Sequence, residues 1–511
     1  MNATHDTVLI VGAGPVGLTA AVQLARLGVA VRVVEVLEQP TTESRAVGVH
    51  ARSMELLASL GALDRLESLG RRVPALDVVD GRTGRARVRM DLGNAPSRHP
   101  YVLDVAQPDT EAVLAERAAE LGVVVDRGVA LAGLTQDDDG VDVVLRSAGG
   151  ESAARYGWVL GADGGHSTTR RLVGTTLEGG FHGQHFAMAD ADVDTSYAPD
   201  SIRMFTHPDG MGMLFPLAGD RARIMFLVDP PPEGTTAPTL AEMQALADVR
   251  MGGAVRMHTP RWLTYFEVHH AQVPRYRFGR VFLAGDAAHI HSPAGAQGMN
   301  TGIQDAANLA WKLALVAQGR ADAALLDSYD AERHPVGAMV VRTTTTLTEV
   351  GTASGPEAVL RNVAMFLVGH VHKVRDVAAS TMAELTINYR DSALSVHHGR
   401  AAVKAGDHAP DPAGTAVAIE DLLATPGFLL VVQGSGQEAA LREVLGDLGT
   451  VVAADDALAQ AYGWPIDGMA LIRPDGYLGL VADSAHPDVL RDYLATSLHF
   501  GGERIEVTAR P

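Results

Sequence analysis

Three glycines near the start of the chain have the spacing of a phosphate-binding turn. The segment Gly12-Ala-Gly14-Pro15-Val-Gly17 follows an apolar run and leads into a helical pattern. The first glycine permits a tight turn, the second lets the backbone approach a pyrophosphate at the helix N-terminus, and the third allows close helix–strand packing. A second apolar run ends on Glu35, where a carboxylate can accept hydrogen bonds from an adenosine ribose. Together these residues predict a site for an adenine dinucleotide.

Two further segments place aspartate and glycine directly after an apolar strand. The first is Gly161-Ala-Asp163-Gly164, which taken alone could be only a hairpin turn. The second is Gly285-Asp286, in which the strand-end aspartate can hydrogen-bond a polyol chain. The chain then enters a long helical pattern, and the start of such a helix presents unpaired N–H groups to an acceptor. The residues of interest in this last run are Pro293, Gly295, Gln297, Gly298, Met299 and Asn300.

The composition narrows the class of protein. With 47% hydrophobic and 20% charged residues, the 511-residue chain has the profile of a soluble globular protein. A net charge of -19 argues against nucleic acid or an anionic membrane as partner. The absence of cysteine excludes disulfides and thiolate chemistry. The N-terminal residues do not resemble a signal peptide and no apolar stretch is long enough to span a bilayer, so we expect a cytoplasmic protein without membrane contact.

The order of the predicted elements indicates an α/β protein in three parts. We expect a Rossmann-like dinucleotide-binding domain made of residues 1–175 and 276–397. Short strand-like pieces in 176–275 predict an inserted β-rich substrate domain, to which residues 72–104 contribute. Glycine, proline and charge between His397 and Gly414 suggest a linker, and 398–511 is expected to form a compact αβ domain.

Some residue patterns are only weak evidence for a functional site. His289 and His291 are spaced like metal ligands, but no further ligand is evident nearby, so no metal site is predicted. Arg52 could contact a cofactor or neutralise an acidic face. A stripe of apolar residues could line a pocket for a planar polycycle, although such stripes are more often core. Its members of interest are Phe205, Met213 and Phe215.

The ordered set of motifs resembles the FAD-dependent class A aromatic hydroxylases, which have the p-hydroxybenzoate hydroxylase fold. The resemblance is carried by Gly12–Gly17, Ser44-Arg45-Ala46, Gln107, Gly161–Gly164 and the run from Gly285 to Asn300, and spans nearly the whole chain. It is nearest to the phenol hydroxylase-like branch that acts on aromatic polyketides such as angucyclines, anthracyclines and tetracyclines. The tail resembles the thioredoxin-like domain of this branch. Because the tail has no CxxC, a redox role for that domain is excluded.

The resemblance implies a role for each motif residue. Glu35 would bind the adenosine ribose, Arg45 and Gln107 would lie along the pyrophosphate and ribityl chain, and Asp286 would hold the ribityl hydroxyls. Asp163 belongs to a motif proposed to serve both FAD and the nicotinamide cofactor. The backbone at Gly295, Gln297, Gly298, Met299 and Asn300 would cradle the flavin pyrimidine, and Pro293 would sit near the reacting substrate. Arg45, Pro293 and Gly298 are therefore the expected catalytic residues.

The resemblance also implies the chemistry. NADPH or NADH would reduce the flavin, O2 would add at C4a, and the resulting hydroperoxide would hydroxylate a polycyclic aromatic polyketide. Since only one GxGxxG occurs, the reductant would dock transiently rather than in its own Rossmann domain. Positive dipole at the helix start near Gly298 would favour the anionic reduced flavin.

Other functions stay open at this point. The nearest alternative is Baeyer–Villiger oxygenation of a polyketide, because fold does not fix function. Hydroxylation of a simple phenol in degradation comes next, and a non-catalytic flavin- or ligand-binding protein represents a different class. A flavin halogenase is disfavoured because its Trp-x-Trp-x-Ile-Pro segment is missing. The oligomeric state is likewise open, with a homodimer as one option.

Overall fold

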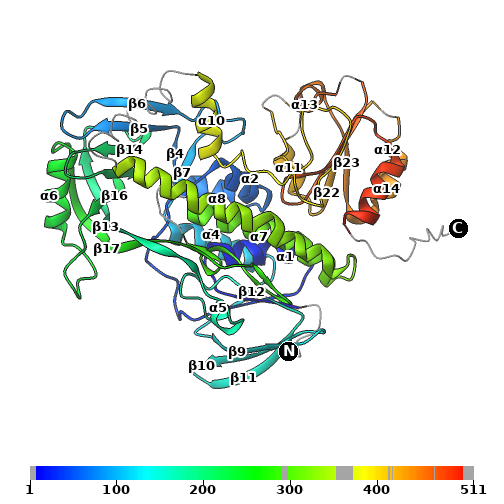
Figure 1. Ribbon diagram of the computed structural model, residues 1–511, viewed down its shortest axis with the longest axis horizontal. Coiled ribbons are helices and arrows are strands. Elements are labelled where there is room, and N and C mark those ends of the chain that lie inside the picture. Colours follow the sequence, from blue (N-terminus) through cyan, green and yellow to red (C-terminus); the bar gives the residue numbers. More distant parts are fainter. Residues whose placement is uncertain are drawn as a thin grey trace.

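The computed structural model describes residues 7–290, 297–352, 372–412, 415–416, 418–434, 436–464 and 466–498. Three bodies are visible in Figure 1: an antiparallel sheet at one end, a central α/β body crossed by two long helices, and a C-terminal module (residues 396–498) at the other end. None of the helices in these described ranges is long and apolar enough to cross a membrane.

The central body is built on a six-stranded sheet. Its strands run parallel except for the edge strand β18, which pairs antiparallel with β19. Alternation with helices gives the doubly wound arrangement expected from the sequence. In spatial order the strands are β18 (Arg277–Phe278), β19 (Val281–Leu283), β12 (Trp158–Gly161), β1 (Val8–Val11), β2 (Val31–Glu35) and β8 (Val125–Arg127).

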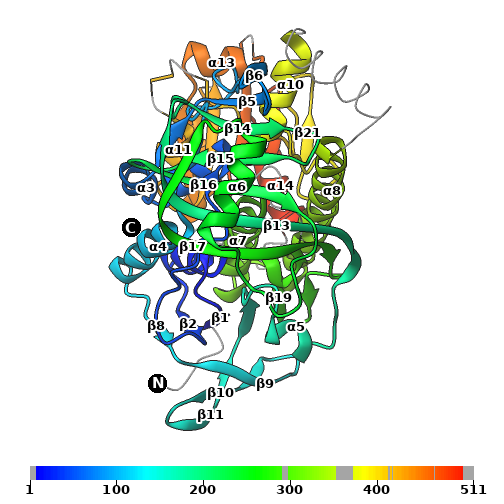
Figure 2. The same ribbon diagram turned by 90° about the vertical axis from the view of Figure 1, so that its left-hand side faces the viewer.

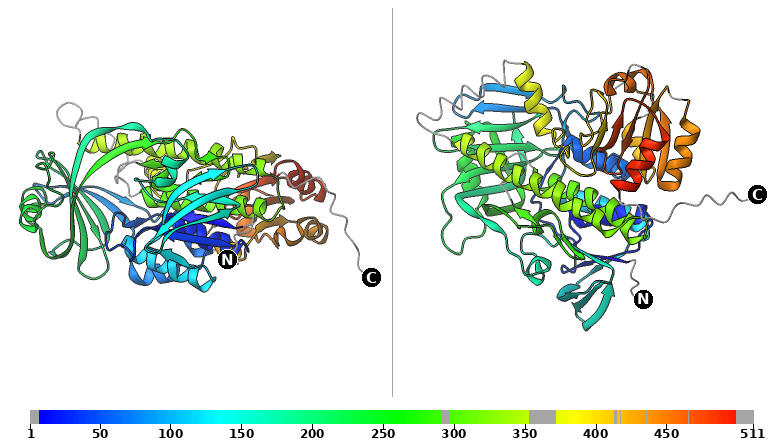
Figure 3. Two further views of the ribbon diagram at one scale, coloured as in Figure 1. Left: turned by 90° about the horizontal axis from the view of Figure 1, so that it is seen from below. Right: turned by 45° about the vertical axis from the view of Figure 1, so that its right-hand side comes forward.

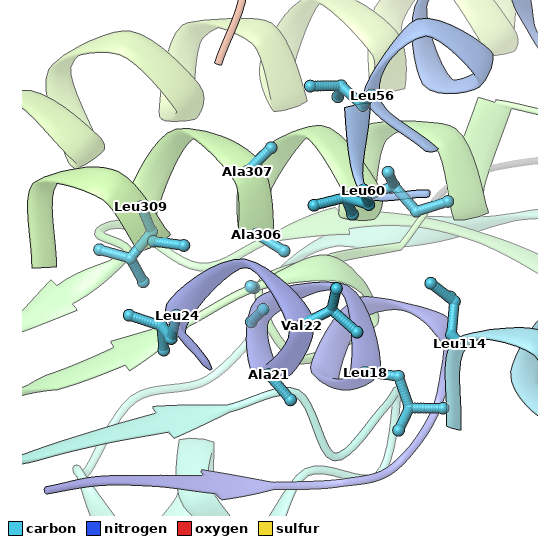
Figure 4. Close-up of a cluster of buried hydrophobic side chains, with 14 of the residues drawn as sticks. Leu18, Ala21, Val22, Leu24, Leu56, Leu60, Leu114, Ala306, Ala307 and Leu309 are labelled. Atoms are coloured by element: carbon cyan, nitrogen blue, oxygen red, sulfur yellow. The ribbon is translucent and has the colours of Figure 1, made fainter. Parts of the chain in front are cut away.

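Helices cover this sheet and enclose the largest apolar cluster of the protein. Apolar side chains of α1 and α7 meet along their lengths, with contributions from α2 and α4 (Figure 4). Small residues such as Ala21, Ala306 and Ala307 let the helices approach closely. The helices of this body are α1 (Pro15–Arg26), α2 (Ala51–Ser59), α3 (Leu63–Leu69), α4 (Gln107–Glu120), α5 (Thr168–Leu172), α7 (Gln297–Ala317) and α8 (Asp327–Thr352), with 3-10 turns η1 (Gly285–Ala287) and η2 (Ala323–Leu326).

An eight-stranded sheet forms the second body, and α6 (Leu240–Arg250) covers its outer face (Figure 2). Neighbouring strands are antiparallel except for the parallel pair β14–β5. α10 (His372–Met382) contributes to the cluster on the inner face. In order the strands are β20 (His289–Ile290), β17 (Val255–Gln272), β13 (Glu178–Thr195), β16 (Arg221–Val228), β15 (Gly212–Pro216), β14 (Ser201–Thr206), β5 (Ala75–Asp80) and β6 (Ala86–Asp91).

Two small sheets complete this part of the chain. One contains β11 (Gly150–Tyr156), β10 (Val141–Ser147) and β9 (Ala130–Gln136) and projects below the central body (Figure 1). The other contains β3 (Gly48–Val49), β7 (Val102–Asp104) and β4 (Arg71–Val73). The second one leads directly from the Ser44–Ala46 segment, so it helps to place that segment.

The C-terminal module holds a five-stranded sheet and lies beside α2 and the end of α7 (Figure 3). Trp311 and Leu315 of α7 belong to the module's own apolar cluster, and the Trp311 ring meets Phe428 edge-on at 5.5 Å between centroids. The module therefore shares its core with the central body. Its elements are β21 (Val396–His398), β25 (Leu478–Ala482), β24 (Gly468–Ile472), β22 (Phe428–Gln433), β23 (Gly449–Ala453), α11 (Ile419–Leu423), α12 (Glu438–Leu445), η3 (Gly446–Leu448), α13 (Asp456–Tyr462) and α14 (Pro487–Thr496).

The structure refines the predicted element limits in two places. β21 begins at Val396 and pairs with β25, so the module's sheet starts before the linker expected from His397 onward. β13 and β17 are single strands of 18 residues with register shifts, where the sequence suggested shorter pieces. Register shifts interrupt the alternation of apolar and polar residues, and this explains why each strand looked fragmented.

Candidate functional site

In the glycine loop between β1 and α1, two of the three motif glycines have no room for a side chain and one has open space beside it. A Cβ at Gly12 would lie 2.3 Å from the Ala162 carbonyl oxygen, and a Cβ at Gly17 would lie 2.0 Å from that of Gly12. Gly12 also has φ +105°, which favours glycine. At Gly14, by contrast, a Cβ would meet nothing within 4 Å. The loop thus leaves free space at the glycine expected to face a pyrophosphate, and a Cβ would fill it.

The Glu35 side chain hydrogen-bonds the backbone of the same loop. Its Oε2 accepts a hydrogen bond from the Ala13 N–H at 2.8 Å, and its Oε1 accepts one from Leu37 at 2.9 Å. Since each carboxylate oxygen can accept more than one donor, the group keeps capacity for ribose hydroxyls. The predicted acid therefore lies against the predicted glycine turn.

Gln107 fixes the Ser44–Ala46 segment. Its side-chain Oε1 accepts from the Ala46 N–H at 3.1 Å, while its own N–H donates to Ser44 Oγ at 3.1 Å. Between these two anchors, Arg45 is exposed, and among the described residues its one ion pair is a surface pair with Glu43 at 3.1 Å. Such a pair contributes little, so the guanidinium can turn to an anion at small cost.

A buried arginine holds this segment from the other side, and no sequence motif indicated it. Arg223 of β16 forms a bidentate ion pair with Asp190 of β13 at 2.8 and 2.9 Å and also donates to the Ser44 carbonyl oxygen. Cross-strand pairing brings Asp190 opposite Arg223. The eight-stranded sheet is thereby tied to the segment that carries Arg45.

Asp286 occupies the 3-10 turn after β19. Its side chain is solvent-exposed, yet surrounding protein atoms raise the pKa of the carboxyl, while His289 and Arg45 oppose that rise. The carboxyl is therefore accessible from solvent although protein atoms surround it. Asp286 makes no side-chain hydrogen bond to any residue that the structure describes, so its oxygens are available to polyol hydroxyls.

Unlike Asp286, Asp163 hydrogen-bonds neighbouring protein groups through its carboxylate. Its carboxylate accepts from Ser167 Oγ at 2.5 Å and from the Thr168 and Thr169 N–H groups at 2.8 and 2.9 Å, and so caps α5. Thr169 Oγ1 adds a bond at 3.0 Å. The carboxylate therefore holds the β12–α5 turn against Gly12, and a direct contact with a cofactor remains a prediction.

The start of α7 contains the remaining predicted residues. Gln297, Gly298, Met299 and Asn300 form its first turn, and Met299 belongs to the central apolar cluster. The Asn300 side chain bonds to the protein backbone rather than outward. The expected positions Pro293 and Gly295, like His291, lie outside the described residues.

Beneath this turn lies a buried charge cluster that sequence reasoning missed. Asp305 lies 2.7 Å from His289 Nε2 and 2.7 Å from Arg333 Nε, and accepts from the Gly285 N–H at 3.1 Å. Burial alone would raise the pKa of Asp305, but Arg333 and His289 hold it below its ordinary value. His289 is thus a buried partner of a carboxylate. No group of three candidate metal ligands occurs in the described part of the chain.

The three residues expected to line a pocket do not share one face. Met213 and Phe215 belong to the cluster on the inner face of the eight-stranded sheet, together with Val47 next to Ala46. Phe205 lies on the outer face under α6, and its ring meets Tyr197 at 5.5 Å. Adjacent strands set this alternation, because Met204 and not Phe205 pairs with Met213.

Comparison with known proteins shows similarity over most of the chain. A family profile described as FAD binding domain matches residues 5–344. The chain is 36% identical to 6-methylpretetramide 4-monooxygenase of Streptomyces rimosus, covering 93% of this chain and 91% of the relative. It is 41% identical to the rifampicin monooxygenase of Streptomyces venezuelae, covering 70% and 74%. The solved anhydrotetracycline hydroxylase from Streptomyces rimosus superposes with a TM-score of 0.80 at 32% identity, covering 96% of this chain and 99% of that one.

Proposed function

Because the chain belongs to the FAD-dependent aromatic monooxygenases, we propose that it hydroxylates a polycyclic aromatic polyketide with NAD(P)H and O2. The observation that carries the proposal is similarity over nearly the full length to relatives named for tetracycline-type substrates. One oxygen atom of O2 enters the ring as hydroxyl, the other leaves as water, and NAD(P)H supplies two electrons.

The residues around the glycine loop fit FAD. Gly14 leaves room for the pyrophosphate, Glu35 stands where the ribose hydroxyls would lie, and exposed Arg45 can neutralise phosphate charge. Asp286 can accept from the ribityl hydroxyls. When bound and reduced, FAD would activate O2 so that one of the oxygen atoms of O2 can be transferred to the substrate. The chain's own contribution is to bind and orient this group, with the positive end of α7 close to its predicted site.

The inner face of the eight-stranded sheet would suit a large planar substrate. It is rich in methionine and aromatic side chains, which adapt to flat ring systems. Phe186 and Phe266 stack at 5.4 Å between centroids on this face. The methionines of the cluster are Met90, Met188, Met211, Met213 and Met225.

Oxygen-isotope labelling tests the reaction. With anhydrotetracycline, rifampicin and phenol as probes, we expect a polycyclic compound to stimulate NAD(P)H consumption and to incorporate one atom from 18O2 as hydroxyl. A lactone product would instead establish Baeyer–Villiger insertion, and faster turnover of phenol would establish degradative hydroxylation. FAD binding without substrate-stimulated NAD(P)H consumption by any probe would contradict the proposal and favour a binding protein.

A further inference from the structure

A turn of the C-terminal module enters a fully buried charge cluster in the central body. The residues Arg473-Pro474-Asp475-Gly476 join β24 to β25, and Arg473 and Asp475 are both buried. We propose that this Arg473–Gly476 turn is a positioning element of the FAD site, acting through α7 and α8. The inference rests on FAD binding alone and is independent of which substrate is hydroxylated.

Arg473 is the centre of the cluster. Its guanidinium forms a bidentate pair with Glu332 of α8 at 2.7 and 2.8 Å, and its Nε donates to Asp475 at 3.0 Å. The same guanidinium lies over the Trp311 ring, 5.2 Å from the centroid. Removing one partner of such a buried pair leaves a charge without compensation, which is far more costly than losing a surface pair.

The turn also contacts α7 directly. Asn308 of α7 donates to Asp475 at 3.2 Å and to Glu332 at 2.7 Å. Lys312, one helical turn further on, lies 2.7 Å from Glu332 and donates to the Asn308 oxygen at 2.8 Å. The module thus fixes how α7 and α8 lie against each other.

Arg333, next to Glu332 on α8, connects this cluster to the proposed FAD site. Arg333 donates to Asp305 at 2.7 Å and to the Thr301 carbonyl oxygen at 3.0 Å, both in the first part of α7. Asp305 in turn accepts from the N–H of Gly285. Since Gly285 directly precedes Asp286, these bonds link the position of α8 to that of the carboxylate proposed to bind the ribityl chain.

A second connection passes through α2. Arg52, in the first turn of α2, donates to the Asp475 carbonyl oxygen and pairs with Glu55 at 3.0 Å. Its guanidinium lies 5.0 Å from the centroid of the Tyr477 ring. Asn300 bonds the same end of α2 to the start of α7. Arg52 therefore joins α2 to the module and also neutralises the buried Glu55.

Two substitutions in the turn test the inference on the full-length protein. Arg473→Met removes the ion-pair partner of Asp475 and leaves Glu332 paired with Lys312 alone, while the milder Asp475→Asn keeps the shape and removes one charge. Arg390→Met is the control, because it removes an exposed Arg–Asp pair near the same module. For each protein we would measure the FAD Kd of the apoprotein, the visible circular dichroism of bound FAD, and the urea midpoint.

We expect both turn variants to weaken FAD binding about tenfold or more, or 1.4 kcal/mol, and to alter the flavin circular dichroism. The control should retain wild-type values. Folded variants with unchanged FAD affinity and spectrum, differing only in urea midpoint, would overturn the inference. If Arg473→Met does not fold, Asp475→Asn decides alone. A wild-type protein that does not bind FAD at all would instead refute the proposed function.

Discussion

The side chain of Asn300 joins the start of α7 to the start of α2 through His50. Asn300 Oδ1 accepts from the His50 N–H at 2.9 Å, and its Nδ2 donates to the Gly48 carbonyl oxygen at 2.9 Å. His50 is the N-cap residue of α2 and lacks a capping side-chain bond, so Asn300 satisfies a backbone donor next to the helix start. The sequence analysis selected Asn300 because its backbone was expected to contact the flavin. The structure shows that the Asn300 side chain also links two helices.

Replacing Asn300 with alanine should destabilise the protein by about 1–3 kcal/mol, because two buried backbone groups lose their partner. Urea unfolding of the apoprotein measures this change. Asn388→Ala removes an exposed asparagine with a weak local bond and is the control, expected within about 0.5 kcal/mol of wild type. Equal stability of the two variants would show that the Asn300 bonds contribute nothing.

The glycine loop predicts different consequences for two Gly→Ala changes. Gly14→Ala fills open space at an ordinary φ of -76°, so the apoprotein should remain folded while FAD binds about tenfold or more weakly. Gly17→Ala places a Cβ against the Gly12 carbonyl and should lower the urea midpoint as well. FAD titration and apoprotein unfolding separate the two effects. Unchanged affinity in Gly14→Ala would argue that no pyrophosphate approaches this position.

The two motif aspartates should also differ. Asp286→Ala removes an exposed acceptor and should weaken FAD binding by about 1.5–3 kcal/mol, with little change in apoprotein stability. Asp163→Ala removes the acceptor for the first two N–H groups of α5, although the N-cap Ser167 remains, and should lower apoprotein stability more than FAD affinity. Isothermal titration with FAD and urea unfolding give both quantities. If Asp286→Ala binds FAD as tightly as wild type, the carboxylate does not serve the ribityl chain.

Sequence patterns were sufficient to predict those parts of the protein in which the motif residues lie within one short strand–turn–helix segment. The strand before Gly12 and the helix after Gly17 follow from periodicity, and the α/β fold and the FAD-dependent class are confirmed. The roles of individual site residues stay predictions, since local geometry shows only that Gly14, Glu35, Arg45 and Asp286 suit them. The helix α8 was not predicted, because its polar start and Pro335 mask the period.

Long-range contacts could not be read from the sequence. Arg223 lies 179 residues from Ser44, and Arg473 lies 141 residues from Glu332. Nothing near either arginine marks it as buried, because the pairing depends on which elements meet in the fold. The expected pocket residues depend on the fold in the same way. Phe205 and Met213 lie on adjacent strands, and only the strand register shows that they face opposite ways. A pocket at Met213 and Phe215 stays a prediction.

Glu384 is a buried acid that no motif indicated. Its side chain accepts from Gln304 Nε2, and its backbone has φ +60°, an uncommon conformation for glutamate. The preceding Ala383 carbonyl accepts from the Arg52 N–H, so the segment caps α2. Burial raises the pKa of Glu384 to about 8, although Arg333 and Arg52 oppose the rise and Asp305 adds to it.

Glu384→Gln should therefore remove a pH dependence of folding. The ordinary pKa is 4.5, so the unfolded chain is ionised while the folded protein still holds the proton. Wild-type stability is then lost as pH rises from about 4.5 to about 8, by up to about 1.4 kcal/mol per pH unit. Glutamine cannot ionise, so the variant should match wild type below about pH 4.5 and become increasingly more stable than wild type as pH rises, reaching the full difference by about pH 8. Urea unfolding across this range measures the difference, with exposed Glu116→Gln as control. Parallel pH profiles for wild type and Glu384→Gln would show that this carboxyl is already ionised in the folded protein.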